Sequence, residues 1–298
     1  MERNRGLLML IQQLVNGVVL SAIYALVALA FSLVMGIFGV LNVAISALFM
    51  IGGYVGLIAV IHGLPVWAAL LGAALAGAAL GVLVERIGYA PFRRAPVIIP
   101  LLSTLGCSIV LQNIATNVWG SDPLQITNPP LAGSVSFAGV RIGDVQVLMI
   151  GVALVFVTAL AVVVRRTKLG RALRAVAENR EVADLLGVPV TMISIAAFAI
   201  SGLLAGTAGF LVALNYGQIT PYIGVDIGLK GIAVMVVGGV DNIWGVLVAA
   251  PILGIAEVLT IAYGASSYRD AVAFGVLILI LLVRPQGLLG GQLVRVRL

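Results

Sequence analysis

The chain has 298 residues, of which 62% are hydrophobic and only 9% are charged, and its formal net charge is +6. Soluble globular domains carry about 25% charged residues, so this composition excludes a soluble fold. The connections between apolar runs are too short to hold a soluble domain. We therefore expect residues 1–298 to form a single transmembrane domain.

Apolar runs of about 20 residues recur along the chain, and a helix of that length crosses about 30 Å of hydrocarbon. They predict an all-α polytopic membrane protein with about 8–10 transmembrane helices. The candidate spans cover roughly residues 8–34, 42–61, 65–84, 97–118, 145–164, 192–214, 230–248, 245–263 and 270–284. The first run is too long for the apolar region of a signal peptide, which predicts a retained first span. In the third run, Gly77 and Gly81 predict a face for close helix packing.

Positive charge indicates which connections face the cytoplasm. The connections at 85–96 and about 165–190 are basic, whereas the loop at about 119–144 carries one arginine and two aspartates. We therefore place the two basic connections and the C-terminus in the cytoplasm, and the loop outside. With nine spans, this placement puts the N-terminus outside, although its two arginines favour the cytoplasmic side. One hidden break within residues 7–61 would add a tenth crossing and remove the conflict.

The external loop contains "SVSFAGVRIG", whose alternation around Ala138-Gly139 predicts a small hairpin. An ordered hairpin on this side could receive a docking protein, or it could simply connect two spans.

Residues 165–189 hold nine of the chain's 28 charged side chains. The apolar residues between 169 and 176 share one helical face, which predicts a first amphipathic helix. A second, short helix follows, which Asn179 can cap and Gly187 can end. Its apolar residues are Val182, Leu185 and Leu186. Such a helix can lie on lipid or insert into a groove of another protein, and its acidic residues favour the protein contact.

No pattern of residues indicates enzymatic chemistry. One cysteine and one histidine exclude a zinc-type metal site. Neither of the two lysines follows the glycine pattern of a phosphate-binding loop. We therefore expect no cofactor, no metal and no catalytic activity, and any energy from ATP has to come from a partner.

Polar residues inside the apolar runs are the remaining functional signal, because a charge in the bilayer costs about 3 kcal/mol. Glu257 is the clearest case, although it could simply be paired with an arginine or tyrosine for packing. The candidate pathway residues are Asn42, Ser46, Thr104, Asn113 and Glu257. Residues 80–95 weakly resemble residues 253–271, which we place on the opposite side of the membrane. Such an echo is expected of an inverted repeat, and it can also arise by chance.

Four stretches in order resemble the family of branched-chain amino acid ABC transporter permeases, the LivH-type inner-membrane subunit. They are "LVNGVVLSAIYALVALAFSLVMGIFGVLNVA", "YAPFRRAPVIIPLLSTLGCSIVLQNIATNVWGSDP", "TKLGRALRAVAENREVADLLGV" and "YRDAVAFGVLILILLVRPQGLLG". The resemblance covers nearly the whole chain. It implies an ABC importer permease fold in the bacterial inner membrane, without catalytic activity of its own.

The resemblance also implies partners: ATP-binding cassette subunits, a second permease subunit of the same or a different kind, and a periplasmic substrate-binding protein. In this family the segment at 167–188 is the cytoplasmic coupling loop that inserts into the ATPase. Together with the apolar face described above, the expected coupling residues are Glu178, Asn179, Val182, Ala183, Leu185, Leu186 and Gly187.

One departure from the family leaves the cargo open. Members usually follow the first span with a run like Asn-Phe-Ala-His-Gly, and this chain has "NVAIS" at 42–46. Branched-chain or hydrophobic amino acids and related small polar organic solutes are therefore all candidate cargoes. A stand-alone secondary carrier or channel is the alternative function, motivated by Glu257 and the inverted echo.

Overall fold

The computed structural model describes residues 2–126, 130–131, 133–137, 140–240, 242–264 and 266–290. The first half contains α1 (Glu2–Phe38), α2 (Ile45–Ile61), α3 (Val66–Val84), the π turn η1 (Glu85–Tyr89), η2 (Ala90–Phe92), α4 (Ile98–Trp119), β1 (Leu124–Gln125), β2 (Ser134–Phe137) and β3 (Val140–Gly143). The second half contains α5 (Asp144–Arg166), α6 (Lys168–Glu178), α7 (Arg180–Leu185), α8 (Val190–Tyr216), β4 (Gln218–Ile219), α9 (Ile223–Gly238), α10 (Ile243–Ala262), η3 (Ser266–Tyr268) and α11 (Arg269–Val283).

The all-α class is confirmed, and the helices differ in their ability to cross a membrane. Among the described residues, α1, α3, α4, α5, α8 and α10 are long and apolar enough to do so. Helices α2, α9 and α11 have 17, 16 and 15 residues. At 1.5 Å per residue each is shorter than about 30 Å of hydrocarbon, so the prediction of 8–10 spans includes three short helices.

Two predicted boundaries differ from the structure. The hidden break that would add a tenth crossing is absent, because α1 runs without interruption to Phe38. The one interruption within residues 7–61 lies between α1 and α2, which the sequence already predicts as two separate spans. The overlapping spans 230–248 and 245–263 become α9 and α10, which are separated at Gly239. This glycine has φ +107°, a conformation that ends a helix. Hydropathy alone does not register such a turn.

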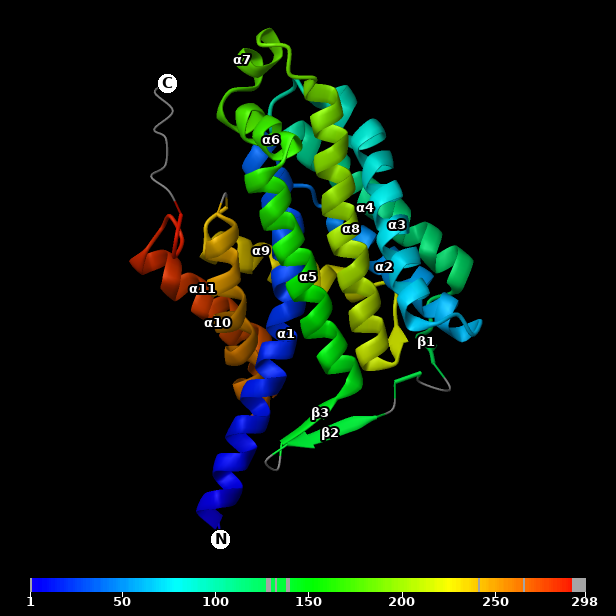
Figure 1. The fold of residues 1–298 in the computed structure, drawn as a ribbon, viewed down its shortest axis with the longest axis vertical. Helices are drawn as coiled ribbons and strands as arrows, with labels where there is room; N and C mark the ends of the chain where they lie inside the picture. The colour runs from blue at the N-terminus through cyan, green and yellow to red at the C-terminus, as the bar shows by residue number, and fades with distance from the viewer. Residues whose placement is uncertain are drawn as a thin grey trace.

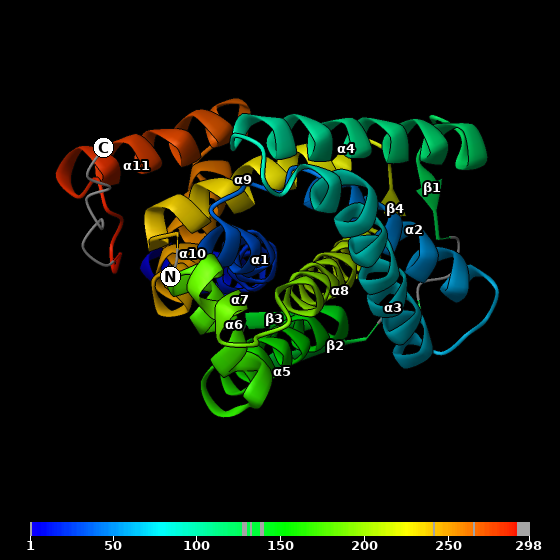
Figure 2. The ribbon, with the colours of Figure 1, turned by 90° about the horizontal axis from the view of Figure 1, so that it is seen from above.

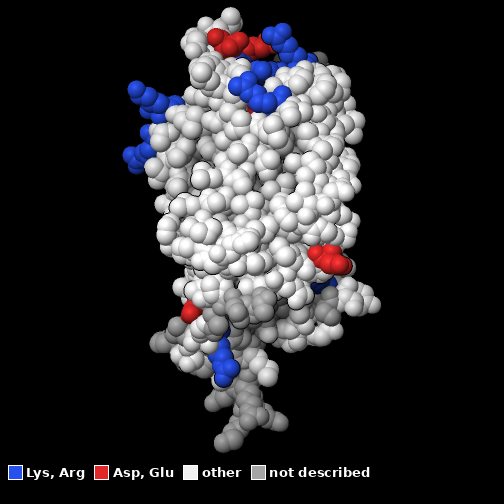
Figure 3. All heavy atoms as spheres, turned by 90° about the vertical axis from the view of Figure 1, so that its right-hand side faces the viewer, with Lys and Arg blue, Asp and Glu red and all other residues white. Residues whose placement is uncertain are grey.

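The two ends of the molecule are formed by different elements. The β2–β3 hairpin and the N-terminus lie at one end, and α6, α7 and the last described residues lie at the other (Figure 1). Gln12 Nε2 donates to the Arg141 carbonyl at 2.9 Å, which ties the start of α1 to the hairpin. Figure 3 shows charged side chains near both ends and a nearly uncharged belt between them. The charge rule predicts that the hairpin end, with the N-terminus, is external and that the end with α6 and α7 is cytoplasmic.

Short strands organise the end of the molecule where the hairpin lies. Strands β2 and β3 pair antiparallel from Ser134↔Gly143 to Phe137↔Val140, which confirms the predicted hairpin, although its turn at 138–139 lies outside the described residues. Strand β1 pairs with β4, Leu124 opposite Ile219, and thereby joins the external loop to the end of α8.

Glycines allow the central helices to approach closely. A Cβ atom on Gly77 would meet the carbonyl oxygen of Gly202, and one on Gly206 would meet the carbonyl oxygen of Ala73. The predicted packing face of α3 therefore lies against α8, with backbones in direct contact.

The packing agrees with an inverted repeat. Helix α8 packs on α3 and α2, and α1 packs on α10 and α9 in the same relation. The two echoing segments, 80–95 and 253–271, each cover the end of one of these paired helices and the turn after it. Helices α4 and α11, which follow those turns, lie along the same side of the molecule in Figure 2.

Candidate functional site

The charged connection at 165–189 is built on an anchored helix, α6. Thr167 caps it by accepting a hydrogen bond from Gly170 N at 3.0 Å. Leu173 and Val176 are buried against residues of α8 and the last turn of α1. The predicted apolar face of this helix is therefore its packing face, and it joins α6 firmly to the membrane core.

The short helix α7 has the caps that the sequence predicts. The Asn179 side chain accepts hydrogen bonds from Glu181 N and Val182 N, both at 3.0 Å. At the other end Gly187 has φ +81°, and Val188 N donates to the Ala183 carbonyl at 3.0 Å. Both ends of this single turn and a half are therefore fixed without any partner.

The apolar side chains of α7 point away from the rest of the chain. Leu185 and Leu186 are 87% and 79% exposed, and Val182 is 49% exposed. Ala183 differs from the other expected coupling residues because it is only 2% exposed and packs inward. Its side chain therefore positions α7, and Glu178, Asn179 and Gly187 lie at the surface beside the exposed face.

Three of the candidate pathway residues meet at the break between α1 and α2. Thr104 of α4 is fully buried, accepts a hydrogen bond from Val43 N at 3.2 Å and donates to the Leu101 carbonyl at 3.0 Å. Asn42 is 1% exposed; its Oδ1 accepts from Ala44 N, and its Nδ2 has no hydrogen-bond partner among the described atoms. Half-buried Ser46 lies against α9, where a Cβ on Gly228 would collide with its hydroxyl.

The other two pathway candidates lie elsewhere. Asn113 is exposed on α4 and donates to the Ile109 carbonyl of its own helix at 2.8 Å, so the structure separates it from the break. Glu257 lies in α10, within a cluster of charged side chains that links four helices.

This charged cluster is centred on a buried ion pair. Lys230 Nζ lies 2.6 Å from Glu257 Oε1 and 3.0 Å from Asp270 Oδ1. The Tyr24 hydroxyl donates to Glu257 Oε2 at 2.5 Å, and Arg269 lies 4.0 Å from Glu257. Helices α1, α9, α10 and α11 thus meet at two cations and two anions, which is a charge-balanced arrangement.

Two of the three buried charged residues in the described part of the chain, Lys230 and Glu85, are not among the candidates that the sequence predicts. Lys230 was examined only as a phosphate-loop lysine, although a lone lysine in an apolar run was itself a signal. Glu85 is completely buried in the π turn η1, where it accepts a hydrogen bond from the Ser194 hydroxyl at 2.7 Å. In the sequence, Glu85 stands beside Arg86 at the end of a span, which indicates a solvent-exposed basic loop rather than a buried carboxylate. Within the described ranges, no group of three His, Cys, Asp or Glu side chains is arranged to hold a metal.

Relatives of known classification match this chain over most of its length. The family model described as "Branched-chain amino acid transport system / permease component" matches residues 13–281. The high-affinity branched-chain amino acid transport system permease protein LivH of Salmonella typhimurium is 36% identical over 293 residues, covering 94% of this chain and 95% of that protein. BraD of Pseudomonas aeruginosa, which has the same description, is 36% identical over 295 residues, with the same coverage.

More distant likenesses extend the set. LivM of Escherichia coli, also described as a permease protein of this high-affinity system, is 28% identical over 297 residues, covering 91% of this chain and 68% of that protein. Among solved structures, PsaBC from Streptococcus pneumoniae in complex with Fab aligns over 91% of both chains, with a TM-score of 0.47 and 17% identity. On the family model and the LivH and BraD relatives, the chain belongs to the family of branched-chain amino acid transport permeases, which are multi-pass inner-membrane proteins.

Proposed function

We propose that this chain is the non-catalytic transmembrane subunit, a single domain over residues 1–298, of a binding-protein-dependent ABC importer. The proposed cargo is a branched-chain or other hydrophobic amino acid, or a related small polar organic solute. The observation that carries the proposal is the capped helix α7, whose exposed Leu185 and Leu186 stand at the cytoplasmic end. Two exposed leucines on a rigid turn suit insertion into a groove on another protein.

The proposed partner at this helix is an ATP-binding cassette subunit, and the packing around α6 supports a route for its work. Leu173 and Val176 of α6 pack on α8 and on Ile37 and Phe38 at the end of α1. A displacement of α7 would therefore reach the two most buried long helices, α1 and α8. A movement of α8 would be transmitted to α3, because the backbones of the two helices are in direct contact at Gly202. No side chain lies between them there whose rearrangement could absorb the movement.

The proposed pathway includes the break at 39–44. Irregular backbone at membrane depth is tolerated where it is buried in protein or lines a polar route. The unpartnered Nδ2 of Asn42 supplies a hydrogen-bond donor there, and Thr104 holds Val43 in place from α4. A donor of this kind suits the carboxylate of an amino acid. Asn113 and Glu257 lie apart from this region, so Asn42, Ser46 and Thr104 are the preferred pathway residues.

Further partners follow from the proposed class. The similarity to both LivH and LivM supports assembly with a second, related permease subunit. The ordered hairpin at the external end supports docking of a periplasmic substrate-binding protein there. The alternative of a stand-alone carrier is motivated by Glu257 and the inverted echo. Glu257 is neutralised by Lys230, which fits a structural ion pair better than an ion-coupling site, and the inverted packing alone does not distinguish a carrier from a permease subunit.

The test compares two charge changes on the same cytoplasmic surface. Leu186→Asp places a negative charge at the exposed apolar tip of α7, and Arg171→Asp, the control, makes a larger charge change on the exposed face of α6. We expect Leu186→Asp to abolish co-purification with the ATPase subunit and uptake of cargo, while membrane insertion and the Arg171→Asp control remain unaffected. Co-purification of Leu186→Asp at the wild-type yield would contradict the proposal.

A further inference from the structure

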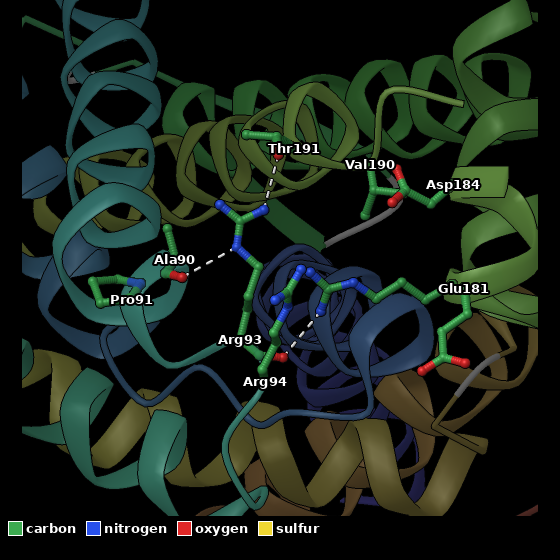
Figure 4. A pocket seen from close by; sticks show the side chains of 9 residues that line it. Ala90, Pro91, Arg93, Arg94, Glu181, Asp184, Val190 and Thr191 are labelled. Atoms are coloured by element: carbon green, nitrogen blue, oxygen red, sulfur yellow. Dashed lines mark hydrogen bonds between the residues drawn. The ribbon is translucent and has the colours of Figure 1, made fainter. Parts of the chain in front are cut away.

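A cavity of about 750 Å³ opens beside α7 on the cytoplasmic face. We call it the arginine pocket, after Arg93, Arg94 and Arg180, which line it together with Thr191. Figure 4 shows the Arg93 guanidinium in the middle, between Ala90 on η2 and Thr191 on α8. Three separate parts of the chain therefore contribute to it: the connection after η2, helix α7 and the start of α8.

Two of the guanidinium groups are held in place by neutral acceptors. Arg93 donates from Nε to the Ala90 carbonyl at 3.1 Å and from Nη1 to the Thr191 hydroxyl at 2.8 Å. Arg180 donates from Nη1 to the Arg93 carbonyl at 3.1 Å and to the Tyr89 hydroxyl at 3.4 Å. These contacts orient the cations but leave their charges unneutralised.

The arginine pocket lacks an internal counter-ion. No ion pair within 4.0 Å among the described residues involves Arg93, Arg94 or Arg180. The acids Glu181 and Asp184 lie on the α7 side of the same cavity without reaching them (Figure 4). Arg93 and Arg180 are half-buried, so each has lost part of its hydration without gaining an anion.

We propose that the arginine pocket is a binding site for a small oxyanion, a carboxylate or a monophosphate. The guanidinium fork matches both groups through paired N–H···O bonds. Three arginines against two acids leave one net positive charge, which fits an anion of low charge better than a polyphosphate. The volume lies within the range of about 300–1,000 Å³ that is typical of small-molecule pockets.

An oxyanion in this position would connect α7 to the rest of the cytoplasmic face. Arg180 belongs to α7, whereas Arg93 and Thr191 belong to the η2 connection and to α8. Bound ligand would therefore fix the position of the exposed Leu185–Leu186 tip relative to α8. The existence of the site does not depend on the proposed function; only this consequence for coupling does.

The test uses the full chain alone, in nanodiscs of phosphatidylcholine, so that a failure of ATPase docking does not affect it. Phenylglyoxal modifies accessible guanidinium groups, and peptide mass spectrometry gives the rate at each arginine. At matched ionic strength, we expect saturating inorganic phosphate to slow the modification of Arg180 by about tenfold, because a guanidinium paired with phosphate is not free to react with the reagent. Arg171, which is exposed on α6 outside the pocket, serves as the internal control and should keep its rate.

Variants connect the protection to the geometry. Arg93→Gln should abolish the protection of Arg180, and Thr191→Val, which keeps every charge, should weaken it several-fold by releasing Arg93. If phosphatidylglycerol protects Arg180 without added phosphate, the site exists and its oxyanion comes from a lipid headgroup. The proposal is overturned if phosphate does not slow the modification of Arg180 in phosphatidylcholine and phosphatidylglycerol does not slow it either. Protection that arises only when the ATPase is added also overturns it, because the pocket then belongs to the protein interface.

Discussion

The buried pair between Lys230 and Glu257 gives a prediction whose size the structure sets. Their side chains are only 6% and 4% exposed, and their charged atoms lie 2.6 Å apart. Removing one partner of a buried pair leaves an uncompensated charge and costs about 3–5 kcal/mol. We therefore expect Glu257→Leu and Lys230→Met each to destabilise the chain strongly.

The two single variants should differ in magnitude. After Glu257→Leu, Lys230 retains Asp270 at 3.0 Å, although that carboxylate is 56% exposed and its interaction is weakened by solvent. The cost should therefore be near the lower end, about 3 kcal/mol. After Lys230→Met, Glu257 retains the Tyr24 hydroxyl and an arginine 4.0 Å away, and the cost should be about 5 kcal/mol.

The double variant separates the pair from its surroundings. Removing both charges leaves mainly the Tyr24 hydroxyl without its acceptor, which costs about 1–3 kcal/mol. We expect the double variant to be more stable than either single variant, as measured by thermal unfolding of the full chain in detergent micelles. One kcal/mol corresponds to roughly 2–4 °C in Tm for chains of somewhat smaller size. Asp270→Asn, at an exposed position, is the control and should change stability by less than about 1 kcal/mol. Unchanged single variants, or a double variant that loses the sum of the two effects, would refute the reasoning.

Three further predictions concern packing, capping and the pathway. Gly77→Leu should prevent correct packing of α3 on α8 and greatly lower the yield of folded chain, whereas Gly106→Leu, with no atom within 4 Å of its added Cβ, should be tolerated; size-exclusion profiles of the two variants decide this. Asn179→Ala should remove about 1 kcal/mol from the α7 cap and reduce ATPase affinity roughly fivefold, and an unchanged affinity in a titration would show that the cap is not needed. Asn42→Ala should lower uptake of cargo in membrane vesicles more than Asn113→Ala, and equal uptake by the two variants would remove Asn42 from the pathway.

The cytoplasmic connection was predictable because its signals are local. Asn179, Gly187 and the apolar spacing between them determine where α7 begins and ends, and all lie within nine residues. The external hairpin was predictable for the same reason. Local capping and turn chemistry do not depend on the arrangement of the membrane helices.

The buried polar clusters were not predictable because their partners are distant in sequence. Lys230 and Glu257 are 27 residues apart, and Tyr24 is 233 residues from Glu257. Only the assembled packing of α1, α9 and α10 brings them together. Likewise, the sequence marks Asn42 and Thr104 only as separate polar residues in two spans, and the packing of α4 against the break brings them together.

The central claim is that α7 faces the cytoplasm and carries the contact with the ATPase. The direct measurement places Leu185→Cys in a Cys107→Ala background, which removes the chain's one native cysteine. A membrane-impermeant maleimide should label this cysteine only from the cytoplasmic side, and a short bifunctional reagent should cross-link it to the ATPase subunit in the assembled complex. Labelling from the external side, or full cytoplasmic reactivity without any cross-link in an active transporter, would contradict the account.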